Sequence, residues 1–165
     1  MAGRIYRVPF ALATVTNAGG DTDLWELTPA DDKPIHIVGI RLGQTMEVGD
    51  AAEEGLDITI EHLAATVTSG SGSAVTPVPA DPGISDLAAG FTAEINGATV
   101  ATTSGTKTIL ESMSWNLRNS PFEIWFPDDE RYAPTARQAT ALVIRKNTTV
   151  ADDISFSGCC WVRED

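Results

Sequence analysis

The residues that most often hold metals or act in catalysis are few in this chain and widely spaced. Its only histidines are His36 and His62, and its only cysteines are the neighbours Cys159 and Cys160. A metal site of the cupin kind needs clustered histidines with a carboxylate. A zinc site or a CxxC redox pair needs a different spacing and more ligands. These four residues therefore predict packing and hydrogen bonding rather than metal or redox chemistry.

Carboxylates are abundant, and many are adjacent in predicted loops: Asp31-Asp32, Glu53-Glu54, Asp128-Asp129-Glu130 and Asp152-Asp153. Pairs this common indicate solvated loops rather than acid–base catalysis. One acidic set could hold calcium through oxygen ligands, but it lacks the spacing of an EF-hand. It consists of Glu47, Asp50, Glu53, Glu54 and Asp57.

Other catalytic and cofactor motifs are missing too. The chain has no G-x-S-x-G elbow, P-loop or dinucleotide fingerprint. We therefore predict no catalytic residue, no cofactor, no metal and a non-enzymatic function.

The tryptophans carry the most information about partners. Period-2 alternation places Trp125 opposite Phe122, Ile124 and Phe126, and it places Trp161 opposite the apolar face of its own strand. Tryptophan on an outer sheet face is typical of interfaces, so Trp125 and Trp161 are the candidate interface residues. Two alternatives stay open: both could pack beneath a long insertion of the same chain, or stack on sugar rings.

The elements that must position these residues are short alternating strands separated by Gly, Pro, Asn and Asp. Residues 108–117 and 122–126 are predicted to be consecutive antiparallel strands, with Ile109, Met113 and Trp115 on one face. Residues 139–146 and 154–162 are predicted to form the last pair. About eight strands and no convincing long helix predict an all-β fold.

Such strands bury their apolar faces by packing two sheets or by closing a barrel. We predict an antiparallel β-sandwich, specifically an eight-stranded jelly roll, with an immunoglobulin-type sandwich as the alternative. Residues 1–165 are expected to form a single domain. Residues 64–105 are mostly Ala, Gly, Ser, Thr and Pro and carry no Lys or Arg, which predicts an elaborated insertion: a partner-facing arm or a surface connection.

The charge balance excludes some functions. The chain has 165 residues with 23 acidic against 11 basic side chains, for a formal net charge of -12. Its basic residues are scattered, which argues against direct nucleic-acid binding. No window approaches the roughly 20 apolar residues of a membrane span, and the N-terminus lacks the apolar segment of a signal peptide. We expect a protein made in the cytoplasm and without membrane association.

The layout resembles small jelly-roll structural proteins of tailed bacteriophages, in particular the capsid decoration or cement class. Four features carry this resemblance: the start Met1-Ala2-Gly3-Arg4, the turn from Gly49 to Gly55 leading into a strand, the Thr/Ser/Gly/Pro-rich middle, and the strand that ends in Cys160-Trp161-Val162-Arg163-Glu164-Asp165. The resemblance implies a virion protein, often a homotrimer, that binds the major capsid protein lattice and stabilises the capsid from outside.

Two other hypotheses stay open beside this one. The chain could be a carbohydrate- or receptor-binding module of a phage tail that uses Trp125 or Trp161 as a stacking platform, or a metal enzyme of the cupin kind. The acid falls mainly in loops, which leaves several sheet faces nearly uncharged. An acidic exterior with neutral attachment surfaces favours a place on the outside of the capsid.

Overall fold

The computed structural model describes residues 3–16, 20–45, 55–83, 88–119, 121–127 and 133–165. These residues contain strands and connections but no helix. The strands are β1 (Arg4–Val15), β2 (Thr22–Thr28), β3 (Ile35–Gln44), β4 (Gly55–Leu63), β5 (Val67–Thr68), β6 (Ser73–Val75), β7 (Val78–Pro79), β8 (Thr92–Gly97), β9 (Thr102–Thr103), β10 (Lys107–Asn116), β11 (Phe122–Trp125), β12 (Thr135–Ala136), β13 (Ala141–Lys146) and β14 (Ile154–Glu164).

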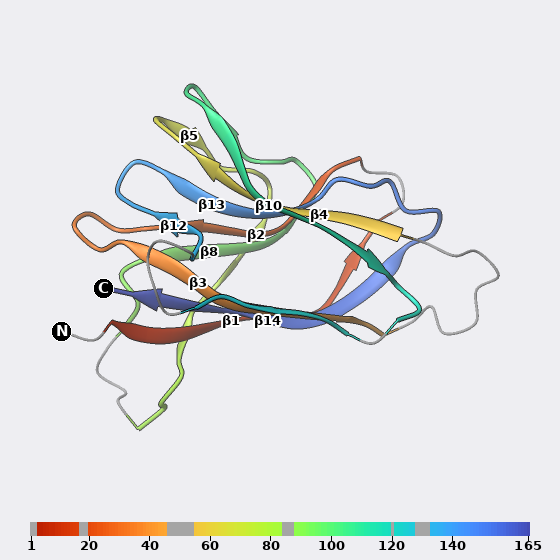
Figure 1. Ribbon diagram of the computed structural model, residues 1–165, viewed down its shortest axis with the longest axis horizontal. Helices are drawn as coiled ribbons and strands as arrows, with labels where there is room; N and C mark the ends of the chain where they lie inside the picture. The colour runs from red at the N-terminus through yellow and green to blue at the C-terminus, as the bar shows by residue number, and fades with distance from the viewer. Residues whose placement is uncertain (1–2, 17–19, 46–54, 84–87, 120, 128–132) are drawn as a thin grey trace.

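Two antiparallel sheets face each other and make the main body of the protein (Figure 1). The first, which we call sheet A, has the order β11-β3-β14-β1-β7, with β12 also pairing with β3. The second, sheet B, has the order β10-β4-β13-β2-β8-β6. The prediction of an all-β protein with antiparallel sheets is therefore confirmed.

The core lies between the two sheets, and alternation within each strand supplies it. In β14, Phe156, Cys160 and Val162 are fully buried, as their shared face predicted. Aromatic rings join the sheets: Phe10 of β1 meets Trp25 of β2 at 5.3 Å between ring centroids, and the indole N–H of Trp25 donates to the carbonyl of Val8 at 3.1 Å.

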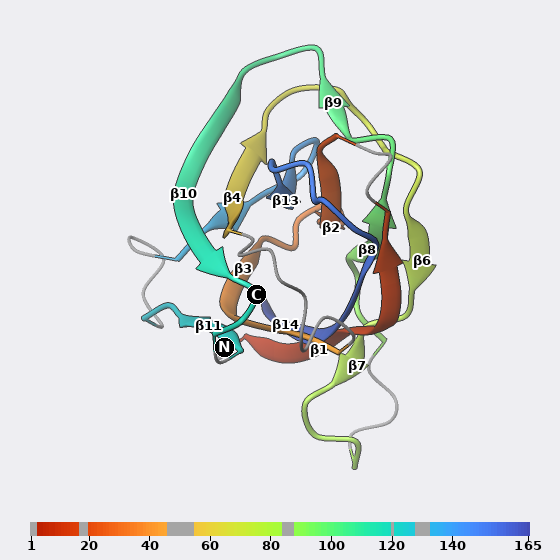
Figure 2. The ribbon, with the colours of Figure 1, turned by 90° about the vertical axis from the view of Figure 1, so that its right-hand side faces the viewer.

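Residues 64–105 do more than connect β4 to β10. Within this segment β8 and β6 extend sheet B, β7 pairs with β1 of sheet A, and β5 pairs with β9 in a separate two-stranded ribbon. In Figure 2, which looks along the sandwich, β6 and β8 lie at one side of the two sheets, β9 lies above them, and β7 lies below, next to β1. The described part of the segment is therefore largely structured by contacts with its own chain.

Two predicted pairings are wrong. Strands β10 and β11 follow each other in the chain, but β10 pairs with β4 in sheet B and β11 pairs with β3 in sheet A. In the same way β13 lies between β2 and β4, whereas β14 lies between β1 and β3. Each connection crosses from one sheet to the other, and periodicity alone does not distinguish such a crossing from a hairpin.

The predicted face of Ile109 is also wrong. Strand β10 has a register shift between Ile109 and Glu111 where it pairs with β4. A β-bulge of this kind adds one residue to one strand and reverses the alternation beyond it. Met113 and Trp115 face the core as predicted, whereas Ile109 lies opposite Glu61 and is 54% exposed.

No helix among the described residues is long and apolar enough to cross a membrane.

A candidate binding surface on sheet A

The outer surface of β11, β3, β14 and β1, which we call the open face, carries the two predicted interface residues. The strand registers place its side chains in two adjacent rows across the sheet. One row holds Trp125, Gly39, Trp161 and Arg7, and the next holds Glu123, Arg41, Cys159 and Pro9. Because neighbouring strands lie about 4.8 Å apart, each row spans roughly 15 Å.

Trp125 and Trp161 form an aromatic pair although a whole strand separates them. Their ring centroids are 4.8 Å apart, with 43° between the ring planes. Gly39 of the intervening strand makes this possible, because the six-membered ring of Trp125 occupies the place where a side chain at position 39 would stand. Its indole N–H donates to Glu123 Oε1 at 2.6 Å, and Trp125 still remains 51% exposed.

A hollow of about 440 Å³ adjoins the aromatic pair. The residues around it include Arg41, Gly43, Pro121, Ser157, Cys159 and Trp161. Gly43 adds no side chain to the hollow, whereas the ring of Trp161 and the guanidinium of Arg41 line it. The open face thus combines apolar surface, aromatic rings and positive charge, which is the composition enriched at protein interfaces.

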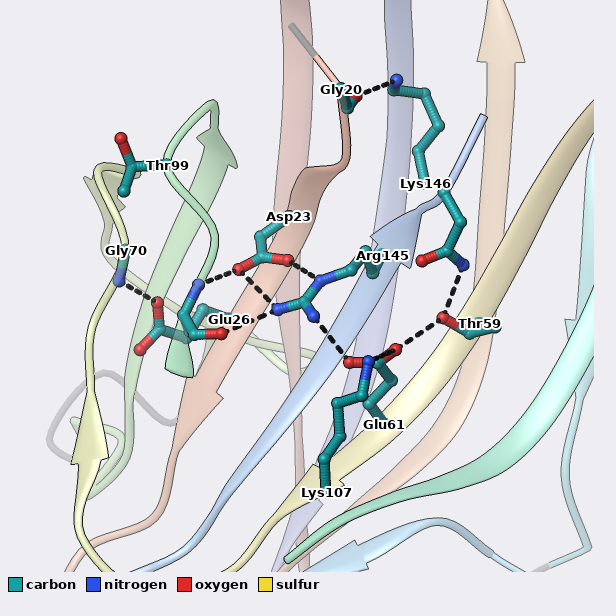
Figure 3. Close-up of polar contacts among 12 residues, drawn as sticks. Gly20, Asp23, Glu26, Thr59, Glu61, Gly70, Thr99, Lys107, Arg145 and Lys146 are labelled. Atoms are coloured by element: carbon teal, nitrogen blue, oxygen red, sulfur yellow. Dashed lines mark hydrogen bonds and ion pairs between the residues drawn. The ribbon is translucent and has the colours of Figure 1, made fainter. Parts of the chain in front are cut away.

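The outer surface of sheet B differs, because residues 64–105 cover its strands β2, β13 and β4, whereas β10 stays exposed at Ile109 and Leu110. Under this cover lies a cluster of buried charges: Asp23 of β2, Arg145 of β13 and Glu61 of β4 (Figure 3). Arg145 Nε donates to Asp23 Oδ1 at 2.6 Å, and Arg145 Nη1 lies 2.8 Å from Glu61 Oε2. The second contact is an ion pair without hydrogen-bond alignment, so Glu61 Oε2 has no hydrogen-bond donor among the described residues.

The covering segment binds directly to this cluster at Ala101. The amide of Ala101 donates to Asp23 Oδ2 at 2.6 Å, and its carbonyl accepts from Arg145 Nη2 at 2.9 Å. Ala101 also packs with Leu63, Val143 and Val67 in a small apolar cluster outside the main core. Charge pairing and apolar packing therefore hold the segment against sheet B at the same place.

Electrostatics show how the cluster is balanced. Burial raises the pKa of Asp23 above its ordinary value, and the hydrogen bonds from Arg145 and Ala101 offset only part of this rise. Burial lowers the pKa of Arg145, but the hydrogen bond and charge of Asp23 and the charge of Glu61 outweigh this effect. The pKa of Arg145 therefore lies above its ordinary value. One guanidinium thus serves two buried carboxylates, and the half-exposed Lys107 adds a second cation 3.1 Å from Glu61 Oε1.

A second anchor of the covering segment lies on Glu26 of β2. Its Oε2 accepts from the amide of Gly70 and from the hydroxyl of Ser69, both at 3.1 Å. Ser69 Oγ lies at the same distance from Glu94 Oε2. Burial raises the pKa of Glu26, with the nearby charge of Glu94 contributing in the same direction. Whether a partner also contacts this segment stays a prediction.

The other candidate residues do not come together. His36 lies on β3 of sheet A, where it bonds Thr135 Oγ1 at 2.7 Å and Asp165 Oδ2 at 2.8 Å. His62 lies on β4 of the other sheet. Cys159 lies on the open face, whereas Cys160 is buried in the core, and burial raises the pKa of both thiols.

The structure gives no metal cluster among the residues it describes, in the sense of three or more His, Cys, Asp or Glu placed to share one ion. Of the acidic set considered for calcium, Glu47, Asp50, Glu53 and Glu54 lie outside the described residues. Asp57 is described, and it accepts from the hydroxyl of Ser112 at 3.4 Å.

Sequence patterns did not reveal the buried charges. In β4, Thr59 and Glu61 alternate with Ile58 and Ile60, which is also the pattern of a strand with one face in water. One signal was available: a segment of 42 residues, 64–105, without Lys or Arg is long enough to cover a sheet face. Arg41 and Arg7 were likewise not singled out.

Comparisons of this chain with protein-family models, with curated proteins and with solved structures gave no match.

Replacing Arg145 by Met should strongly destabilise the protein, because it leaves Asp23 and Glu61 buried without their shared cation. We expect the free energy of unfolding to fall by about 3–5 kcal/mol in a denaturant titration. The matched control is Lys107→Met, which removes the half-exposed cation beside Glu61 and should cost at most about 1 kcal/mol. Equal, small losses for the two variants would contradict the importance given to Arg145.

Replacing Gly39 by Ala should separate the two tryptophan rings, because the new methyl group would stand 2.6 Å from Trp125 Cζ3. We expect the exciton couplet of the Trp125–Trp161 pair in the circular dichroism spectrum to be lost. Gly43→Ala is the control: on the same strand, its methyl group would meet its nearest neighbour, Pro121 Cβ, at an ordinary 3.8 Å. An unchanged couplet in the Gly39 variant would show that the glycine does not position the ring.

Proposed function

We propose that this chain is a non-enzymatic virion structural protein, a capsid decoration protein that binds the outer surface of the major capsid protein lattice. The observation that carries the proposal is the contrast between the two outer surfaces. On sheet B the chain's own residues 64–105 cover β2, β13 and β4 and leave, among the described residues, only the edge strand β10 with large exposed apolar side chains, Ile109 and Leu110. The open face of sheet A presents an exposed aromatic pair, with Trp125 at 51% exposure beside Trp161. A protein that bridges capsomers needs such an exposed apolar surface and no active site.

The strand order supports a jelly roll within this proposal. The order is β1-β14-β3-β11 in one sheet and β2-β13-β4-β10 in the other. The pairs β1–β14, β2–β13, β3–β11 and β4–β10 therefore join the first principal strand to the last, the second to the next-to-last, and so on inward. This is the order produced when one long hairpin of eight strands rolls into two sheets. The remaining short strands extend these sheets or form the small ribbon.

The net charge supports a place on the capsid exterior. At -12 the chain would be repelled by packaged nucleic acid. The exposed pair Asp31-Asp32 lies in the turn before β3 rather than in a strand of sheet A. Acidic connections beside a less acidic attachment surface suit a protein bound to the outside of a shell. Self-association as a homotrimer belongs to the same proposal.

Co-sedimentation with empty capsids, assembled from the major capsid protein encoded in the same genome, tests the proposal. Wild-type protein should co-sediment, and Trp125→Ala should weaken binding roughly thirtyfold if the ring is an interface hot spot. Ile109→Ala is the control, because Ile109 is equally exposed at 54% but lies on β10 of sheet B. Light scattering should give the mass of a trimer. A monomer that ignores capsids would contradict the proposal.

One observation favours a second function, carbohydrate binding. The ring of Trp125 lies over the backbone at Gly39 and remains half exposed, and such a ring can serve as a platform for the apolar face of a sugar. In this case a glycan array should give specific binding, and the bound sugar should change tryptophan fluorescence in the wild type but not in Trp125→Ala. A protein that binds no glycan on the array would exclude this function.

A further inference from the structure

The open face differs in charge from the chain as a whole. The chain has about twice as many acidic as basic residues, 23 against 11. On the open face, Arg7 and Arg41 are exposed basic residues. Among the described outward positions of β11, β3, β14 and β1, only Glu123 is acidic, and its carboxylate already accepts the indole N–H of Trp125 at 2.6 Å. The face is therefore locally positive on an acidic protein.

Arg7 and Arg41 have no carboxylate partner among the described residues. Several other described cations do have one: Lys33 meets Glu164, Lys107 meets Glu61, and Arg145 meets Asp23. Arg163, at the end of β14, is bound to Asp165. By contrast, neither Arg7 nor Arg41 has an ion pair with any residue that the structure describes. Both guanidinium groups are thus available to an outside carboxylate.

The strand registers fix the spacing of these two arginines. Arg7 of β1 lies opposite Trp161 of β14, and Arg41 of β3 lies opposite Cys159 of the same strand. Strand β14 therefore separates the two arginines. Their Cα atoms lie two strand spacings apart across the sheet and two residues apart along the strands, or roughly 12 Å in all. In an extended segment this distance corresponds to about three to four residues. Trp161 lies between the two arginines.

We propose that the open face binds an extended acidic segment of its protein partner, with one carboxylate at Arg7, a second about three to four residues away at Arg41, and an apolar side chain between them against Trp161 and Trp125. The inference rests on the proposed function in taking a protein as the partner. Arginine suits this task because its planar guanidinium pairs with a carboxylate in two parallel hydrogen bonds.

A protein segment fits these residues better than a sugar does. The two arginines and the aromatic pair are spread over β1, β14, β3 and β11 rather than around one ring. Further apolar side chains continue the surface at its β1 edge, where Ile5 is 40% exposed and Val78 of β7 is 45% exposed. This width suits a chain that crosses several strands.

Charge reversal with capsids is the first arm of the test. Arg7→Glu and Arg41→Glu should each weaken capsid binding roughly tenfold, and wild-type binding should fall as salt is added. Arg118→Glu makes the same charge change in the exposed turn after β10, outside the open face, and should leave binding within about twofold of wild type. Capsid binding that survives both reversals unchanged would overturn the inference and leave the proposed function standing.

A second arm does not need capsids. The probe is the synthetic peptide Glu-Phe-Ala-Glu, titrated while tryptophan fluorescence is measured, with Lys-Phe-Ala-Lys as the matched peptide. The acidic peptide should change the emission of the wild type and of Arg118→Glu but not of the double variant Arg7→Glu/Arg41→Glu, and the basic peptide should have no effect.

The two arms separate the possible failures. Wild-type protein that binds the acidic peptide but no capsid would overturn the proposed function and keep the inference. No response to the peptide, together with capsid binding that does not depend on the arginines, would overturn the inference alone. A response only to an oligosaccharide of uronic acids, tested in the same titration, would replace the protein partner by an acidic glycan and also overturn it.

Discussion

A single buried guanidinium, that of Arg145, joins three neighbouring strands of sheet B to the segment that covers them. Its partners Asp23 and Glu61 come from the strands on either side, and its contact with the carbonyl of Ala101 extends the cluster into residues 64–105. Two buried carboxylates without this cation would impose a large desolvation cost. The cover over sheet B therefore combines this ion-paired side chain with the apolar packing of Leu63, Val143 and Ala101.

Because residues 64–105 cover much of sheet B, the outer surface of sheet A is the larger exposed sheet surface that a partner could contact. The outer side of sheet A has no comparable cover among the described residues, and its strand β3 has glycine where a side chain would block the aromatic pair. Gly39 thus lets Trp125 lie across β3 and reach Trp161, so that two rings from different strands make one exposed patch. The position of Arg7 and Arg41 around this patch follows from the strand registers. The same sandwich therefore has a closed and an open face, and the proposed attachment uses the open one.

Period-2 alternation predicted a good part of this arrangement. It placed Trp125 and Trp161 outward and Trp115 inward, because strict alternation holds in the stretches that carry them. It failed for Ile109, since the bulge in β10 depends on pairing with β4. It also failed to pair the strands, because β10 and β11, like β13 and β14, are joined across the sandwich. The Asp23–Arg145–Glu61 cluster could not be predicted from the sequence for another reason. Polar residues that alternate with apolar ones give the same sequence pattern whether a covering segment or water lies over them.

Oxidative footprinting of the protein, free and bound to capsids, tests most directly the claim that the open face is the attachment surface. With hydroxyl radicals as the oxidant, both tryptophans are reporters on that face, and the exposed side chain of Ile109 on β10 reports on the opposite sheet. The account predicts that capsid binding protects Trp125 and Trp161 while the oxidation rate of Ile109 stays unchanged. Protection of Ile109 with both tryptophans unchanged would show that attachment uses sheet B and would contradict the account.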